Sequence, residues 1–84
     1  MESGKILTDI NYGFLIEPNK FAVASTVLKV QTYYNSANSI YLKLKGFNNI
    51  ADRMYKNLQK DSLIMVTGKL LTDGFIEVES FKIL

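Results

Sequence analysis

The chain has 84 residues, 48% of them hydrophobic, a net charge of +2, and neither cysteine nor histidine. This composition excludes disulfides and thiolate zinc sites and removes the commonest general base and metal ligand, so stability has to come from packing. A chain of this size hides only about 60% of its unfolded surface, which leaves little room for a buried catalytic cavity. We therefore expect a single domain over residues 1–84, with no cofactor and no metal.

The ends and the composition of the chain give weak signals about its location. The first residues, MESGKILTD, carry neither a secretory nor a transit pattern, and no apolar run approaches the roughly 18 residues of a membrane span. Abundant lysine, asparagine, isoleucine and tyrosine is typical of A+T-rich genes. We expect the bacterial cytoplasm or the interior of an organelle, a plastid or mitochondrion, and no membrane span.

The first half of the chain reads as two strands and a loop. Residues 5–16 predict one long strand, interrupted near Asn11-Tyr12-Gly13, where glycine permits a bend or bulge. Pro18-Asn19 predicts a tight turn, and the apolar and β-branched residues 21–31 predict a second strand. The following segment, TYYNSANS, is typical of a polar loop.

The stretch IYLKLKGF, residues 40–47, alternates between two rows as a strand with one buried face does. The row expected in the core is Ile40, Leu42 and Leu44. The row expected outside interleaves aromatic rings with positive charge: Tyr41, Lys43, Lys45 and Phe47.

A short amphipathic helix is predicted after this strand. Asn48 or Asn49 can cap it, and Asp52 sits in its first turn, where a carboxylate favours the exposed amides. Its apolar stripe at helical spacing is Ile50, Met54 and Leu58, with Ala51 and Tyr55 beside them.

Residues 62–71 and 75–83 predict two more strands, joined by a two-residue hairpin turn at Asp73-Gly74. The predicted order is three strands, a helix and a hairpin. This order indicates an all-β domain with one helix, the five-stranded OB-fold barrel, although the pattern alone leaves other small β barrels open.

From residue 40 onward the sequence resembles the bacterial-type single-stranded DNA-binding proteins, the SSB family. The resemblance is carried by LKLKGFNNIADRMYKNLQKDSLIMVTGKL and, upstream, by FAVASTVLKV. It points to a minimal form, because LLTDGF replaces the long arm between strands four and five and no acidic tail follows Leu84. The resemblance implies an OB fold and DNA-stacking roles for Tyr34, Tyr41 and Phe47.

Physical chemistry agrees with a nucleic-acid partner for the outer row. An aromatic face stacks on any base, and lysines attract the phosphate backbone without reading sequence. We expect Lys43 and Lys45 to make such contacts, with Lys29 and Lys69 extending the basic track. The function expected is therefore sequence-nonspecific binding of single-stranded DNA, or of RNA.

Several alternatives stay open at the sequence level. Strand lysines often serve only solubility, and Phe47 can turn into the core at a bulge beside Gly46. Glu77 and Glu79 would repel phosphate if they shared the face of Tyr41. The alternative function is a structural or accessory subunit of a larger protein complex that does not bind nucleic acid.

The sequence does not indicate an enzyme. Glu77 and Glu79 lie on an open strand without a pocket that would raise a pKa, and the chain shows no nucleophile–base pair, glycine-rich phosphate loop or metal-ligand spacing. One small domain should bind a polymer weakly, so we expect a homo-oligomer or a subunit of a larger assembly.

Overall fold

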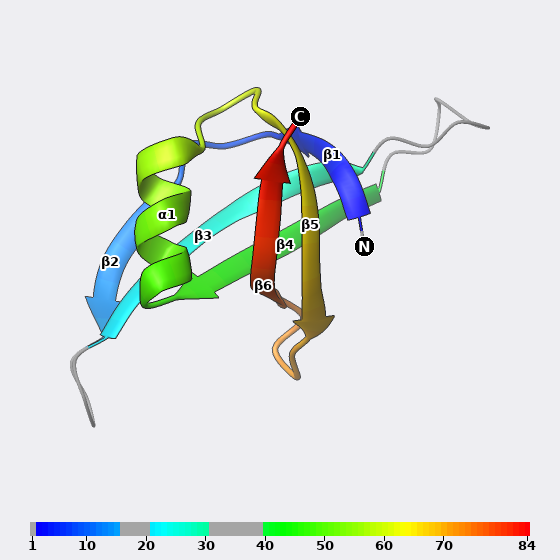
Figure 1. Cartoon of the computed structure of the whole chain (residues 1–84). Helices are drawn as coiled ribbons and strands as arrows, with labels where there is room; N and C mark the ends of the chain where they lie inside the picture. The colour runs from blue at the N-terminus through cyan, green and yellow to red at the C-terminus, as the bar shows by residue number, and fades with distance from the viewer. Residues whose placement is uncertain (1, 16–20, 31–39) are drawn as a thin grey trace.

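The computed structural model describes residues 2–15, 21–30 and 40–84 (Figure 1). The predicted turn at Pro18-Asn19, the loop over 32–39 and the end of the second strand at Gln31 lie outside these ranges. The elements in chain order are β1 (Glu2–Ile6), β2 (Asn11–Leu15), β3 (Phe21–Val30), β4 (Ile40–Phe47), α1 (Asn49–Asn57), β5 (Leu63–Leu70) and β6 (Ile76–Ile83).

The strands close into a barrel. Their order is β1-β5-β6-β4-β3-β2, and a further pairing of β1 with β3 closes the ring. All neighbouring strands are antiparallel except β4 and β6, which run parallel. Because β2 continues β1 along the same partner β3, the two are halves of one long first strand. The predicted five-stranded OB-fold barrel with one helix is confirmed.

The interruption of the first strand lies at residues 7–10, so its prediction near Asn11-Tyr12-Gly13 was wrong. Before this interruption β1 pairs with both β3 and β5, and after it β2 pairs with β3. There Leu7 N–H donates to Val27 O at 2.9 Å, and the hydroxyls of Thr8 and Thr26 are hydrogen-bonded at 2.9 Å. A side chain at Gly13 would meet no atom within 4 Å, so nothing there requires glycine.

The core fills the barrel and continues beneath α1, which packs against β3 and β4. Gly46 allows the helix to come this close, because a Cβ there would lie 2.5 Å from Met54 Sδ and 2.9 Å from Ile50 Cγ2. Ile40, predicted to be buried, is 51% exposed because it lies at the outer end of β4. The largest fully buried side chains are Ile6, Leu28, Leu44, Met54 and Ile64.

The helix begins and packs differently from its prediction in two respects. Asn48 is the N-cap, but its side chain makes no capping hydrogen bond, and its backbone N–H donates to Ala22 O at 2.9 Å. Asn48 has a positive φ of 54°, and the backbone changes direction there between β4 and the helix. Of the predicted stripe, Ala51, Met54 and Leu58 are buried, whereas Tyr55 is 57% exposed.

The hairpin between β5 and β6 has a three-residue loop, so the predicted two-residue turn was wrong. Leu71 N–H donates to Phe75 O at 2.7 Å, and Gly74 N–H donates to Leu71 O at 3.1 Å. A two-residue turn of the predicted type needs positive φ at both central residues, but here Gly74 (φ 88°) has it and Asp73 does not. The connection is nevertheless short, as the resemblance to a minimal form implied.

Candidate nucleic-acid interface

The predicted outer row of β4 faces away from the core and continues across β3. In the antiparallel register the two strands pair residue by residue, and paired side chains point to the same side of a sheet. We call this surface the outer face; its members are Val23, Ser25, Val27 and Lys29 of β3, and Tyr41, Lys43, Lys45 and Phe47 of β4.

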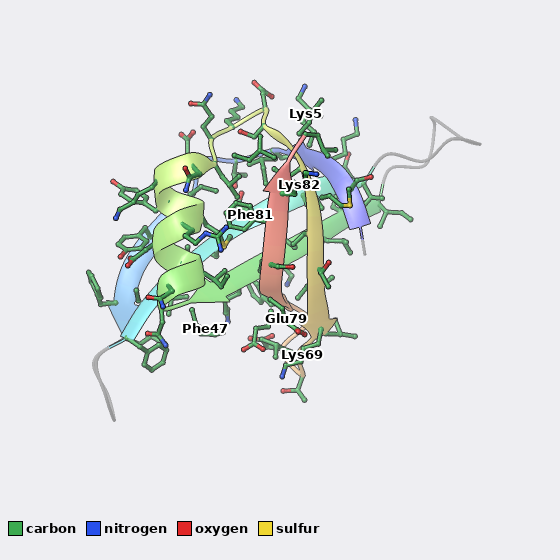
Figure 2. All side chains as sticks on the ribbon, in the orientation of Figure 1. Lys5, Phe47, Lys69, Glu79, Phe81 and Lys82 are labelled. Atoms are coloured by element: carbon green, nitrogen blue, oxygen red, sulfur yellow. The ribbon has the colours of Figure 1, made fainter. Side chains whose placement is uncertain are left out.

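Phe47 lies on the outer face and not in the core. It pairs with Val23 and is half-buried, and its ring centroid lies 5.8 Å from that of Phe21 at a tilt of 55°. Figure 2 shows it at the end of β4 below α1. Because Gly46 is the residue that faces the helix, the alternation continues to the end of β4 without a bulge. Phe47 and Phe21 therefore form an aromatic pair at one end of the face.

Tyr41 stands at the other end of the outer face. It is 57% exposed and pairs with Lys29, which is also exposed. A ring that is both fixed on a strand and open to solvent can stack on a planar ligand at small ordering cost. Tyr34, the third aromatic implied by the resemblance, lies outside the described residues.

The two central lysines converge on Phe75, which follows the hairpin turn. Lys43 Nζ lies 5.0 Å and Lys45 Nζ 4.3 Å from the centroid of its ring. Lys45 Nζ also donates to Asp73 Oδ2 at 2.9 Å. This hydrogen bond, together with one from Phe75 N–H, lowers the pKa of the Asp73 carboxyl. The charge of Lys45 is thus partly neutralised within the protein.

Lys69 is paired in a similar way. Its Nζ lies 3.4 Å from Glu77 Oε2 near the hairpin end of β5 (Figure 2). Glu77 is also in register with Lys45 on the parallel strand β6, so it borders the outer face, as the sequence left open. Among the residues that the structure describes, Lys29 and Lys43 have no carboxylate partner. The free positive charge of the interface is therefore concentrated on these two lysines.

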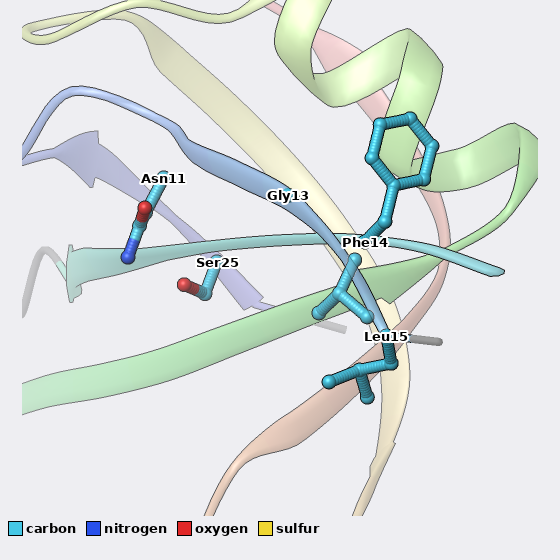
Figure 3. Close-up of a pocket in the computed structure, with 6 residues that line it drawn as sticks. Asn11, Gly13, Phe14, Leu15 and Ser25 are labelled. Carbon is cyan, nitrogen blue, oxygen red and sulfur yellow. The ribbon is translucent and has the colours of Figure 1, made fainter. Parts of the chain in front are cut away.

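The outer face is hollowed beside β2. One hollow of about 190 Å³ runs along β2 from Asn11 to Leu15, and Figure 3 shows Asn11 and Ser25 side by side in it. A second hollow of about 300 Å³ shares Asn11 and Ser25 in its lining, so the two hollows lie next to each other. The residues lining the second hollow are Thr8, Asp9, Asn11, Ser25, Thr26, Val27, Lys43 and Phe75.

A further aromatic cluster lies where β2 meets α1, and the sequence did not indicate it. The rings of Tyr12 and Tyr55 are stacked with centroids 4.6 Å apart, and Phe14 meets Tyr12 edge-on at 5.6 Å. The Tyr12 hydroxyl donates to Asp52, and this hydrogen bond raises the pKa of Tyr12. The contact between Tyr12 and Tyr55 joins two elements that are distant in sequence, so local periodicity did not predict it.

The outer face carries aromatic rings and lysine side chains. Aromatic rings and ammonium groups suit planar bases and phosphates. Over the described ranges, no group of three or more acidic side chains is placed to hold a metal ion. In the same ranges the helix is too short and too polar to cross a membrane.

The fold is similar to that of single-stranded DNA-binding proteins. The SSB domain of a Synechococcus sp. protein superimposes with a TM-score of 0.80 and 16% identity over 96% of this chain and 93% of that domain. The wild-type single-stranded DNA binding protein from Thermus aquaticus gives 0.80 and 19% over 98% of this chain. The second single-stranded DNA binding protein from Mycobacterium smegmatis gives 0.76 and 15%, covering 98% of this chain and 83% of that one.

These likenesses concern structure. No family model matches the sequence, and no curated protein sequence matches it. This chain spans 37% of the length of the Thermus aquaticus protein. The chain has the SSB-like OB fold, with the brief connection between β5 and β6 described above.

Proposed function

We propose that this chain binds single-stranded nucleic acid, DNA or RNA, through the outer face. The observation that carries the proposal is the row Tyr41, Lys43, Lys45 and Phe47, which lies outward on β4 beside an open hollow. The likeness to single-stranded DNA-binding proteins supports it at the level of the fold.

The dimensions of the row suit a strand of several nucleotides. Tyr41 and Phe47 are six residues apart on an extended strand, which corresponds to about 20 Å. Bases stacked on these two rings would each contribute about 1–3 kcal/mol, without reading sequence. Lys43 lies between them, where it meets the phosphates.

The salt dependence of binding tests the proposal. If the two unpaired lysines, Lys29 and Lys43, meet phosphates, log K should fall with log salt at a slope of about −1.4. The measurement is fluorescence anisotropy of a labelled oligo-dT, first at low salt and then at rising salt. Absence of binding at low salt with protein at tens of micromolar would contradict the proposal.

The carboxylate of Asp73 should compete with phosphate for Lys45. We expect Asp73→Asn to raise the affinity for oligo-dT about threefold and to steepen the salt slope by about 0.7, because one more lysine becomes available. The same anisotropy titration measures both quantities.

Glu79→Gln is the matched control for this change. It removes one negative charge from an exposed position of β6 that has no ion pair among the described residues. An equal gain in affinity for the two variants would show that Asp73 acts only through net charge.

A second candidate function is an accessory module of a protein assembly that does not bind nucleic acid. The pairing of Lys45 with Asp73 and of Lys69 with Glu77 favours it, because both pairs weaken the attraction for phosphate. Tyrosine is a frequent anchor in protein interfaces, so Tyr41 would then contact a protein. Oligo-dT binding that is lost in Tyr41→Ala and Lys43→Glu would exclude this candidate.

Under either function we expect association with other chains. A single short domain with two unpaired lysines should bind a polymer modestly, and linking several copies raises the overall affinity. Sedimentation of the protein with and without oligo-dT measures the assembly.

A further inference from the structure

We propose that the hollow between residues 7–10 and Phe75 is a base-selective subsite that prefers guanine and disfavours thymine. This inference rests on the proposed binding of single-stranded nucleic acid and adds to it a preference at one nucleotide. It is carried by the side chains that line the hollow, above all Asp9 and Lys43.

The walls of the hollow are fixed by hydrogen bonds of the fold. On one side, Thr26 Oγ1 donates to Thr8 O at 3.1 Å and is bonded to the Thr8 hydroxyl, which holds residues 7–10 against β3. On the other side, Phe75 is held by the hairpin turn, where its carbonyl accepts from Leu71 N–H. The backbone around the hollow is therefore preformed, which lowers the ordering cost of binding.

Asp9 and Lys43 carry opposite charges and line the same hollow, yet they do not pair with each other. Both are exposed, and in the described part of the chain Asp9 has neither an ion pair nor a hydrogen bond. By contrast, Lys45 and Lys69 each have a carboxylate partner. The hollow therefore presents an unused acceptor and an unused donor to a ligand.

A carboxylate beside a phosphate-binding path is unfavourable for the backbone itself, so Asp9 suits the edge of a base. Single-stranded bases are commonly bound by stacking and by hydrogen bonds to their Watson–Crick edge. The volume of about 300 Å³ lies at the small end of ligand pockets and suits one base, with Phe75 and Val27 as apolar walls.

Guanine fits this pair of charges best. Its Watson–Crick edge carries two adjacent donors, N1–H and N2–H, followed by the acceptor O6. The Asp9 carboxylate can accept from both donors while the Lys43 ammonium donates to O6. Thymine has a single donor between two carbonyl oxygens, which a carboxylate repels. Cytosine and adenine each offer one amino group and rank between the two.

The experiment compares labelled oligo-dT of about eight nucleotides with the same oligomer carrying one central dG. We expect the wild-type protein to bind the dG oligomer about tenfold more tightly. Asp9→Asn should abolish this ratio, because the amide replaces one acceptor by a donor. Glu79→Gln is the matched control, since it removes the same charge at an exposed position of β6 that does not line the hollow, and it should keep the ratio.

The outcomes separate the inference from the function on which it rests. Equal affinity of the wild-type protein for the two oligomers would overturn the guanine preference and leave nucleic-acid binding standing. A ratio that persists in Asp9→Asn would also overturn it. Absence of binding to either oligomer would overturn the proposed function, and the subsite with it. Thermal unfolding of Asp9→Asn, expected to match that of the wild type, confirms that the variant is folded.

Discussion

Leu44→Ala should lower the free energy of unfolding by about 3 kcal/mol, because Leu44 of β4 is fully buried in the core of the barrel. The loss combines the transfer free energy of the removed methyl groups with the cavity that they leave. A domain of this size has only about 5–10 kcal/mol of stability, so the effect is large. Urea unfolding followed by circular dichroism at 25 °C measures it.

Leu70→Ala is the matched control, since it removes the same atoms at a position that is 75% exposed. We expect a change within about 0.5 kcal/mol. Similar losses in the two variants would mean that Leu44 does not lie in the core, and the assignment of inner and outer rows on β4 would fail.

The double variant Tyr41→Ala/Lys43→Glu should weaken binding to oligo-dT about 100-fold. One stacking ring is worth about 1–3 kcal/mol, and reversing the charge of Lys43 turns an attraction for phosphate into a repulsion. The salt slope should become shallower at the same time. Fluorescence anisotropy at low salt measures the affinity, and circular dichroism confirms the fold.

The chain offers a matched control in Tyr55→Ala/Lys56→Glu. It makes the same two changes on α1, and Tyr55 has the same 57% exposure as Tyr41. We expect its affinity to stay within about threefold of the wild type, the residual effect coming from net charge. A loss as large as that of the first double variant would place the interface elsewhere.

The fold and the main row of the candidate site were predictable because they depend on local periodicity. The alternation from Ile40 to Phe47 placed four side chains on the outer face, and the register of β3 and β4 confirms this placement. The order of strands and helix predicted the OB fold, because few small barrels insert a helix between the third and fourth strands.

Other features depend on contacts between segments that are distant in sequence. The pairing of Lys45 with Asp73 joins β4 to the three-residue hairpin turn between β5 and β6. Tyr55 looked like part of the helical stripe, but its ring stacks on Tyr12 of β2. That Asp9 and Phe75 line one hollow could not be predicted from local pattern, since they lie 66 positions apart in the chain.

The ion pairs have a functional consequence. With Lys45 and Lys69 both held by carboxylates, the attraction for phosphate depends mainly on Lys29 and Lys43. Binding should therefore rely more on stacking than on charge, which agrees with a shallow salt slope. Selectivity for bases becomes more visible when the nonspecific electrostatic part of the affinity is small.

The most direct test of the interface is an NMR titration of the ¹⁵N-labelled protein with oligo-dT. We expect the largest changes in amide chemical shift on β3 and β4, around Lys29, Lys43 and Phe47, and at Phe75, with little change on the exposed side of α1. No shifts at saturating oligo-dT, or shifts confined to α1 and β5, would contradict the proposal that this protein binds single-stranded nucleic acid through its outer face.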